Sequence, residues 1–346
     1  MLELVTYESS VDNFGAELGG FTRGTPLVPI RGIYAPQEVP LGDKGRLPLF
    51  VAKELFPGSG EPVWFWLGRL RCEGQAMGRL TGKIAFITGA GAGIAKATAL
   101  AFVREGAKVG LAEINPDLGR AAERAVREAG GEALFIETDV TQDAAVKRSI
   151  DATADRFGGL SVLMNCAGGS LQEDVPVHEM DLEIWERTVA LNLRHPFLCC
   201  RHGIPHMLKG GRGSIINLSS WLGLLGSEKP AYATCKGGIV SFTKTLAAEY
   251  MGNGIRANAI APGTVRTERS IKRWENKDML LADNPSPQVR ARIATRKTYP
   301  FSVGDAGDIA EIAVFLASDE SRMLTGTVLA ADGGRSACFK PIMVEG

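Results

Sequence analysis

Tyr232 and Lys236 are the two residues whose types and spacing could most directly do chemistry. Four positions apart, they share one face of a helix and are separated by one turn. A lysine ammonium beside a phenol favours the phenolate, so a pKa of about 10 would move towards neutrality. Ser220 follows the apolar run 214–218, which is typical of a buried strand. A hydroxyl at the end of that strand, facing the helix, could polarise the oxygen of an alcohol or a carbonyl.

A tyrosine–lysine pair also occurs by chance on solvated helices. A glycine-rich turn earlier in the chain supports a catalytic interpretation of this pair. Residues 88–95 lie between an apolar strand, 84–88, and a helix that reaches Phe102. Glycines permit a tight turn and a close approach of backbone to a pyrophosphate, and the start of a helix offers N–H donors. A glycine-rich loop without a ligand is the alternative. The candidate dinucleotide contacts in this turn are Gly89, Gly91, Gly93 and Ile94.

Glu113 ends the second predicted strand, and its type and place bear on the choice of dinucleotide. A carboxylate there can accept hydrogen bonds from both hydroxyls of an adenosine ribose. It would repel a 2′-phosphate, and neither Ile114 after it nor Ala92 in the turn supplies a cation. The sequence therefore predicts NAD in preference to NADP, with a surface carboxylate at Glu113 as the alternative.

These residues need a scaffold, and after Lys83 the chain alternates strands and helices. The predicted strands are 84–88, 108–113, 134–136, 160–165, 214–219, 256–260 and 326–331. After the first helix, the predicted helices are 116–129, 142–157, 181–208, the Tyr232 helix to about 251, and 307–317. Such alternation predicts an α/β fold, a doubly wound parallel sheet of the Rossmann type with helices on both faces.

Further motifs complete the set, and together they resemble the short-chain dehydrogenase/reductase family. They are the glycine turn, Asn165-Cys166-Ala167-Gly168, Asn192, Ser220, Tyr232 with Lys236, and Pro262-Gly263-Thr264-Val265-Arg266-Thr267. The resemblance covers about residues 79–337, in order. Where the family usually has a second asparagine, this chain has Cys166. That departure bears on a polar contact that supports the sheet, but it removes no catalytic group.

The resemblance implies a role for each matching residue. Tyr232 would be the general acid and base, Lys236 would lower its pKa and hold the nicotinamide ribose, and Ser220 would bind the substrate oxygen. Asn192 would hold a water that relays protons, and Pro196, which cannot bond its carbonyl, should kink the helix there. An incidental asparagine on a kinked packing helix is the alternative. The other implied cofactor contacts are Asp139, Val140, Asn165, Ala167, Gly168, Pro262, Gly263, Val265 and Thr267.

Composition sets the broad class of the protein. The 39 basic and 39 acidic residues balance to a net charge of zero, so no nucleic acid or anionic membrane is predicted as a partner. No apolar run is long enough to span a bilayer, and no secretory signal is visible in the first twenty residues. The six cysteines show no spacing typical of disulfides or zinc ribbons. A reduced, cytoplasmic setting is therefore expected.

Residues 1–76 differ in composition from the rest, with eleven glycines and seven prolines and no catalytic constellation. Two interpretations stay open: this segment is a genuine non-catalytic extension, or translation starts at Met77. The Rossmann-fold dehydrogenase domain is expected at 77–346.

Two further features are an excess of basic residues in one segment and a group of side chains of the types that bind metals. Residues 264–298, a substrate lid by the resemblance, carry nine basic and four acidic side chains. An anionic substrate would explain this excess, although a solvated lid face is the favoured interpretation. His202 and His206 share a helical face with Cys199, but Gly203 and Pro205 should disturb that helix. No third histidine or nearby carboxylate completes a zinc set, so no metal is predicted.

The sequence thus predicts a soluble NAD-dependent oxidoreductase that interconverts a small-molecule secondary alcohol and a ketone by hydride transfer. The alternatives are a 3-oxoacyl-thioester reductase and a non-catalytic nucleotide-sensing protein, which would not need the whole Ser/Tyr/Lys/Asn set. By the resemblance, the long helices would assemble a homotetramer. An apolar substrate wall is suggested by Trp221, Leu222, Leu224 and Leu225.

Overall fold

The computed structural model describes residues 37–40, 46–49, 78–272, 301 and 303–337. The chain divides into two compact units, Met1–Ala76 and Met77–Gly346. In the first unit, β1 (Gln37–Pro40) and β2 (Arg46–Leu49) pair in antiparallel fashion. The remainder of that unit, and residues 273–298 of the predicted lid, lie outside the described residues.

Seven parallel strands form the sheet of the second unit, in the order β11-β8-β7-β6-β3-β4-β5. They are β3 (Ile84–Thr88), β4 (Lys108–Glu113), β5 (Ala133–Glu137), β6 (Val162–Asn165), β7 (Gly213–Leu218), β8 (Ile255–Pro262) and β11 (Val328–Ala331). From β3 the chain adds β4 and β5 on one side and then returns to place β6 on the other. Ligands bind at the carboxyl ends of strands at such a reversal. The predicted doubly wound parallel sheet is confirmed.

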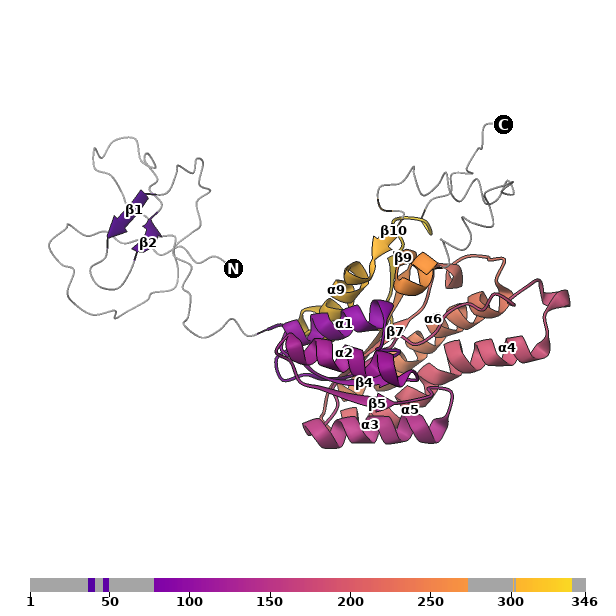
Figure 1. The fold of residues 1–346 in the computed structure, drawn as a ribbon, viewed down its shortest axis with the longest axis horizontal. Coiled ribbons are helices and arrows are strands. Elements are labelled where there is room, and N and C mark those ends of the chain that lie inside the picture. The colour runs from indigo at the N-terminus through magenta and orange to yellow at the C-terminus, as the bar shows by residue number, and fades with distance from the viewer. Residues whose placement is uncertain (1–36, 41–45, 50–77, 273–300, 302, 338–346) are drawn as a thin grey trace. The chain divides into compact units, whose positions relative to one another are not determined.

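Helices cover both faces of this sheet, which explains why its central strands are mostly apolar. One layer holds α1 (Gly93–Arg104), α2 (Pro116–Glu128) and α9 (Ala306–Ala317). The other holds α3 (Asp143–Phe157), α4 (Leu182–Val189), α5 (His195–Lys209) and α6 (Pro230–Tyr250). Figure 1 shows α1 and α2 on one side of β4 and β5, with α3 on the other. Among the described helices, none has the length and apolar character needed to cross a membrane.

The helix predicted at 181–208 is interrupted at the residues that matter for the site. Between α4 and α5, Ala190–Arg194 form a π-helical turn in which the His195 N–H bonds the Ala190 carbonyl. Pro196 follows at once and has no N–H to offer the preceding turn. A single π-turn of this kind adds one residue to the helix and often occurs at functional sites. The break therefore falls on Asn192, as the proline suggested.

The expected disturbance of this helix at Gly203 and Pro205 is wrong. α5 continues through both residues. At Gly203 the helix approaches the sheet so closely that a Cβ would lie 2.7 Å from Leu163 Cδ1, so the glycine serves packing. The two histidines on α5 each meet a separate aspartate of α3: His202–Asp143 and His206–Asp151, both at 2.8 Å. No group of three His, Cys, Asp or Glu side chains that could hold a metal occurs within the described ranges.

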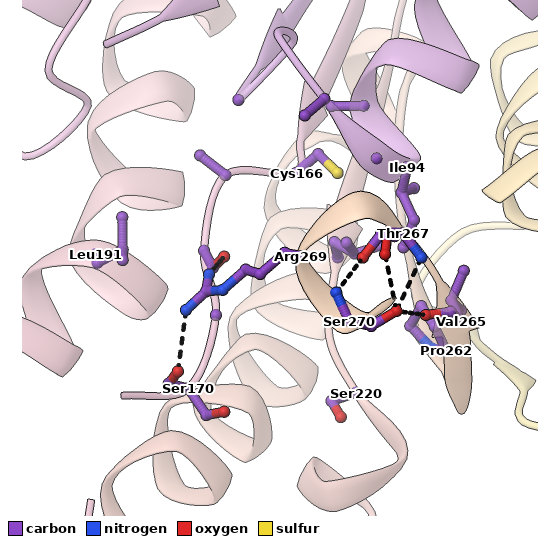
Figure 2. Close-up of a pocket in the computed structure, with 18 of the residues that line it drawn as sticks. Ile94, Cys166, Ser170, Leu191, Ser220, Pro262, Val265, Thr267, Arg269 and Ser270 are labelled. Carbon is purple, nitrogen blue, oxygen red and sulfur yellow. Dashed lines mark hydrogen bonds between the residues drawn. The ribbon is translucent and has the colours of Figure 1, made fainter. Parts of the chain in front are cut away.

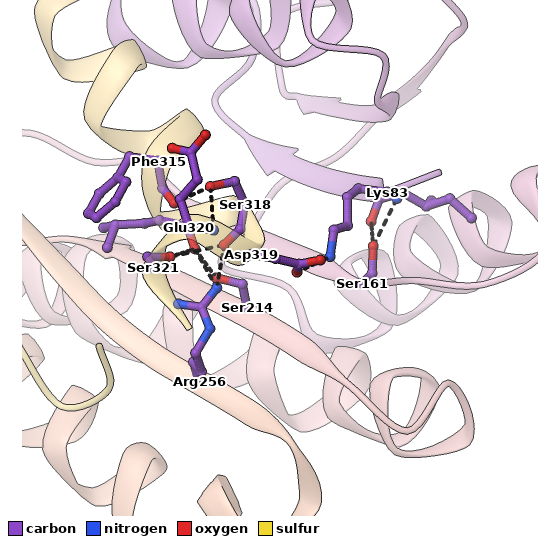
Figure 3. Close-up of polar contacts among 11 residues, drawn as sticks. Lys83, Ser161, Ser214, Arg256, Phe315, Ser318, Asp319, Glu320 and Ser321 are labelled. Atoms are coloured by element: carbon purple, nitrogen blue, oxygen red, sulfur yellow. Dashed lines mark hydrogen bonds and ion pairs between the residues drawn. The ribbon is translucent and has the colours of Figure 1, made fainter. Parts of the chain in front are cut away.

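A polar cluster fastens α9 to the opposite end of the sheet from the glycine turn. Arg256, near the start of β8, donates to the Leu316 carbonyl at 2.8 Å and the Ser318 carbonyl at 3.1 Å, where α9 ends (Figure 3). The carbonyl groups at the end of a helix have no N–H partner within the helix, and Arg256 supplies donors to carbonyls there. Lys83, just before β3, pairs with Asp319 at 2.6 Å. The carboxyl ends of the strands stay open for the site.

Removing residues 1–76, so that the protein starts at Met77, is expected to leave fold and activity intact. Every described core residue belongs to the unit that begins at Met77. For a domain of this size about 1 kcal/mol corresponds to about 2–4 °C in Tm, so we expect a shift of Tm within that range. Differential scanning calorimetry and steady-state kinetics of the two proteins test this. An insoluble or inactive shortened protein would show that residues 1–76 contribute to the fold.

Candidate functional site

A cavity of about 810 Å³ opens at the carboxyl ends of the central strands, where the strand order reverses. Figure 2 shows Ser220 and Arg269 among the side chains around it. The predicted site residues that line it are Gly89, Gly93, Ile94, Glu113, Asp139, Val140, Ala167, Gly168, Ser220, Tyr232, Lys236, Pro262, Gly263, Val265 and Thr267. The other three predicted residues do not line the cavity themselves: Gly91, Asn165 and Asn192. The structure thus brings the predicted residues to one place.

The glycine turn is shaped by close contacts that leave no room for side chains. Gly89 has a left-handed backbone (φ 68°), and a Cβ there would lie 3.0 Å from the Ala167 backbone. At Gly91 a Cβ would lie 2.9 Å from Glu113 Oε2, and the Gly91 N–H donates to that oxygen at 3.0 Å. Gly93 begins α1 with φ 57°. These features fit a diphosphate held by backbone N–H groups at the start of a helix.

Glu113 is fixed at the end of β4 by the backbone around it. Its Oε2 accepts from Gly91, and its Oε1 accepts from the Asn115 N–H at 3.0 Å. Each carboxylate oxygen has a second lone pair, so the side chain can still accept two ribose hydroxyls. Among the described residues that line the cavity, the Lys and Arg side chains are Lys236 and Arg269, neither of which neighbours Glu113 in the sequence. This donor and acceptor set fits a nicotinamide dinucleotide with an unmodified ribose.

Ser220, Tyr232 and Lys236 line the cavity from β7 and α6. The Ser220 and Tyr232 hydroxyls form a hydrogen bond. Lys236 is 3% exposed, and its Nζ donates to the Leu218 carbonyl at 2.7 Å and lies 5.6 Å from the centre of the Tyr232 ring. Burial lowers the pKa of Lys236 to about 8. The arrangement can bind an alcohol or ketone oxygen between two hydroxyls and exchange one proton with it.

The expected lowering of the Tyr232 pKa by Lys236 is wrong for this structure. Burial raises the pKa of Tyr232 to about 12, and the groups that oppose this rise are the Ser220 hydroxyl and the Arg269 cation. Lys236 is not among the groups that shift this pKa, and its ammonium donates to the Leu218 carbonyl. Sequence spacing shows that two side chains share a helical face. It shows neither how deeply the tyrosine is buried nor which carbonyl accepts a hydrogen bond from the lysine.

Asn192 supports the loop after β6. It is fully buried, its Oδ1 accepts from the Gly169 N–H at 2.9 Å, and its Nδ2 donates to the Gly169 carbonyl at 3.2 Å. Nδ2 also donates to the Thr188 carbonyl at 3.0 Å. Gly168 is pressed against it, since a Cβ there would lie 2.7 Å from Asn192 Oδ1. The side chain therefore positions the loop beside Lys236, and a proton relay through Asn192 stays a prediction.

Sequence reasoning missed a buried network beneath the same loop. Thr88 Oγ1 accepts the N–H groups of Cys166 and Ala167 at 2.9 and 3.0 Å and lies 3.2 Å from His195 Nε2. Burial lowers the pKa of His195 to about 3, so the imidazole is neutral. Its Nδ1 lies 2.7 Å from the Leu191 carbonyl and must carry the proton, because a carbonyl only accepts. Nε2 therefore accepts from the Thr88 hydroxyl, and this fixes the direction of the whole network.

Asn165 and Cys166, at the end of β6 and directly after it, have separate roles beside the cavity. Asn165 Nδ2 donates to Asn217 Oδ1 at 2.8 Å, and Asn217 Nδ2 donates to Thr243 Oγ1 at 3.0 Å, which ties β6, β7 and α6 together. Cys166 meets the cavity, and burial raises the pKa of its thiol to about 12, so it stays protonated. It is therefore no nucleophile at neutral pH. The loop is held through the Cys166 backbone whatever its side chain.

The expected apolar wall at residues 221–225 is not part of the cavity. Trp221 instead lies under the Arg335 guanidinium, 5.3 Å from the ring centre, and Leu225 is exposed. Apolar surface in the cavity comes from Leu191, Leu218 and Val265, among others. The chain turns away after Ser220 because Ser220 Oγ caps the short helix Trp221–Gly223 through the Leu222 N–H.

The root of the predicted lid reaches across the cavity through two charged residues that the sequence did not single out. Thr267 and Ser270 cap a short helical turn, since each side-chain oxygen accepts the N–H of the other residue at 3.2 and 2.9 Å. The turn directs Glu268 to the Gly93 N–H at 3.1 Å and Arg269 to the loop after β6 (Figure 2). The only signal in the sequence was the excess of charge in 264–298.

Glu268→Gln is expected to lower the Kd for NAD about two- to fivefold. The Glu268 carboxylate occupies an N–H at the start of α1, where a diphosphate would bind, and an anion at that place contributes about 0.3–1 kcal/mol. Isothermal titration calorimetry measures the change. Glu128→Gln, an exposed carboxylate at the end of α2, is the matched control and should leave the Kd unchanged. Unchanged or weaker binding by Glu268→Gln would refute the competition.

Comparison with known proteins identifies the family. A family model described as Enoyl-(Acyl carrier protein) reductase matches residues 89–336. The crystal structure of a short-chain dehydrogenase/reductase from Burkholderia xenovorans superposes with a TM-score of 0.67 at 34% identity, over 76% of this chain and 100% of that one. The chain belongs to the short-chain dehydrogenase/reductase family. It is therefore an oxidoreductase, and its cofactor is a nicotinamide dinucleotide.

Other members of the short-chain dehydrogenase/reductase family are similar at the same level. The 2,5-dichloro-2,5-cyclohexadiene-1,4-diol dehydrogenase of Sphingobium indicum is 37% identical over 75% of this chain and 98% of its own. The cis-4-hydroxycyclohexanecarboxylate dehydrogenase of Sinomonas cyclohexanicum is 36% identical over 74% and 97%. Carveol dehydrogenase from Mycobacterium avium, in complex with NAD, is 28% identical with a TM-score of 0.70, over 75% and 100%.

Proposed function

We propose that this enzyme is an NAD-dependent dehydrogenase that oxidises secondary alcohols on small rings to ketones. The observation that carries the proposal is one cavity with Ser220, Tyr232 and Lys236 at one part of its wall and Glu113 at another. The first three suit an alcohol and its proton, and Glu113 suits a ribose without a 2′-phosphate. Two relatives are named for alcohols on a cyclohexane or cyclohexadiene ring, which supports the ring as the substrate class.

Some residues of the cavity handle the proton of the substrate, and others bind the cofactor. When bound, the nicotinamide accepts the hydride from the carbinol carbon. Ser220 and Tyr232 hold the hydroxyl oxygen, and Tyr232 takes its proton. Lys236 binds the nicotinamide ribose, and the Thr88 and Asn192 networks fix the loop 166–169 beside it. The Glu113 carboxylate holds the adenosine ribose.

The charge on Tyr232 sets the direction in which it works. With its pKa raised to about 12, the phenol is protonated at neutral pH and is ready to donate when a ketone is reduced. Oxidation needs the phenolate, which Ser220 and Arg269 stabilise through a hydrogen bond and a positive charge. A protein that merely sensed nucleotide would have no use for this second part of the cavity.

Steady-state assays test the proposal directly. We expect turnover of cyclohexanol-type secondary alcohols with NAD, a lower kcat/KM with NADP, and less activity on open-chain alcohols. The panel includes 3-oxoacyl thioesters with NADH, since the family model is described by an acyl-carrier reductase. Faster reduction of the thioesters than oxidation of any ring alcohol would replace the proposed substrate class with acyl chains.

A further inference from the structure

Arg269 lies at the mouth of the cavity, where its guanidinium is held by backbone carbonyls. Its Nη2 donates to the Ser170 carbonyl at 3.1 Å and its Nη1 to the Gly168 carbonyl at 3.4 Å (Figure 2). A guanidinium has five N–H groups. These contacts with described residues use two of them, and Arg269 also lines the cavity.

The charge of Arg269 is not matched by a carboxylate in the part of the chain that the structure describes. Some other described arginines have such partners: Arg79 meets Glu320 at 2.7 Å, and Arg266 meets Asp305 at 3.8 Å. The acidic neighbour in the sequence, Glu268, points instead to the start of α1. A cation that lines a partly apolar cavity beside neutral carbonyls favours an anionic ligand, because a guanidinium binds a carboxylate through two parallel hydrogen bonds.

The Arg269 charge and the reacting phenol of Tyr232 line one cavity, which limits the class of ligand that could contact both. Arg269 lowers the pKa of Tyr232, so its charge acts directly on the phenol that exchanges the proton. Both residues line the same cavity as Leu191 and Leu218. A molecule whose hydroxyl meets Tyr232 could therefore place an anionic group at Arg269, with an apolar body against the leucines of the same cavity.

We propose that Arg269 determines specificity for a secondary alcohol that also carries an anionic group, a carboxylate or a sulfonate, across the ring from the carbinol. The inference rests on the proposed function and adds the substrate's charge to it. One relative, named for cis-4-hydroxycyclohexanecarboxylate, acts on such a molecule. The competing explanation is that Arg269 only fastens the lid root to the loop after β6.

The experiment compares an acid with its neutral analogue. In Arg269→Gln, kcat/KM for cis-4-hydroxycyclohexanecarboxylate should fall on the order of 100-fold, mainly through KM, since a charge-assisted bidentate pair is lost. The value for the corresponding carboxamide should fall much less, because the amide loses only the effect of the Arg269 charge on the Tyr232 phenolate. Arg269→Lys should restore part of the loss, since it keeps the charge without the fork. The 4-hydroxycyclohexanesulfonate arm shows which anion fits better.

Arg266→Gln is the matched control, because it removes one charge from the same segment but does not line the cavity. It should treat acid and amide as the wild type does. Equal losses for acid and amide in Arg269→Gln would overturn the proposal and leave Arg269 as a fastening for the lid. So would a wild-type enzyme that uses the amide as well as the acid.

A binding measurement separates failure of this inference from failure of the proposed function. Calorimetry with the NAD-loaded protein measures the Kd of cyclohexanecarboxylate and of cyclohexanecarboxamide, neither of which can react as an alcohol. We expect the carboxylate to bind more tightly and to lose that advantage in Arg269→Gln. If no alcohol is oxidised but this pattern holds, Arg269 is confirmed as an anion site and the proposed oxidation of alcohols is rejected. If alcohols are oxidised and the pattern is absent, Arg269 is not the anion site.

Discussion

Replacing Tyr232 by phenylalanine should reduce kcat for alcohol oxidation by about 10²- to 10⁴-fold, the usual contribution of a general acid or base. The change deletes the hydroxyl that bonds Ser220 and keeps the ring and its packing. The Kd for NAD should change little, because the ring and Lys236 remain. Stopped-flow kinetics and calorimetry measure the two quantities separately.

Tyr250→Phe is the control for this substitution, since Tyr250 ends the same helix α6 and does not line the cavity. It should keep wild-type turnover. Turnover of Tyr232→Phe within a few fold of the wild type would remove Tyr232 from the mechanism.

The pH dependence of the wild type follows from the pKa of Tyr232. A group with its pKa raised to about 12 is protonated at neutral pH, and its phenolate fraction rises about tenfold per pH unit below that value. Alcohol oxidation should therefore accelerate with pH up to about 8, where Lys236 is half deprotonated and its contact with the nicotinamide ribose weakens. Ketone reduction uses the protonated phenol and should stay flat over the same range. The rise in oxidation should vanish in Tyr232→Phe.

The second large effect concerns cofactor choice. Combining Glu113→Ala with Ile114→Arg should shift the ratio of kcat/KM for NAD to that for NADP by about 10²-fold or more towards NADP. Charge-assisted hydrogen bonds contribute about 1.5–3 kcal/mol each, and Glu113 can offer two to the ribose. Ile114 is 61% exposed, so an arginine there can reach a 2′-phosphate without being buried.

Two further variants separate the parts of this effect. Glu113 also holds the Gly91 N–H, so its loss weakens the glycine turn for either cofactor. Ile114→Arg alone keeps that bond and should raise kcat/KM for NADP without lowering it for NAD as strongly. Glu137→Ala, at the end of the neighbouring strand β5, is the control and should leave the ratio unchanged. A wild type that already prefers NADP would exclude Glu113 as the selector.

The sheet and most of the cavity wall followed from local sequence. Buried parallel strands are short apolar runs, and the glycine turn and the Tyr232–Lys236 spacing have a meaning that depends on few neighbours. Strand bounds agree with the structure to within a few residues, as in β4, where Lys108–Glu113 was predicted in full.

What the sequence did not show depends on contacts between distant segments. The pairing of Thr88 with His195 spans 107 positions, and that of Gly93 with Glu268 spans 175. Arg269 was one of nine basic residues in its segment, and its place in the cavity wall and its contact with the Ser170 carbonyl came only with the structure. The direction of the Tyr232 pKa shift was wrong for the same reason, since burial is a property of the folded chain.

Deuterium transfer tests the central claim most directly. A ring secondary alcohol labelled with deuterium at the carbinol carbon is incubated with the full-length enzyme and NAD, and mass spectrometry follows the label. The account predicts one ketone formed per labelled NADH, with the deuterium on the nicotinamide ring, and transfer slower by about 10²-fold or more in Tyr232→Phe. An enzyme that binds NAD but yields neither ketone nor labelled cofactor with any alcohol of the panel would contradict it, and would leave a nucleotide-binding protein without this chemistry.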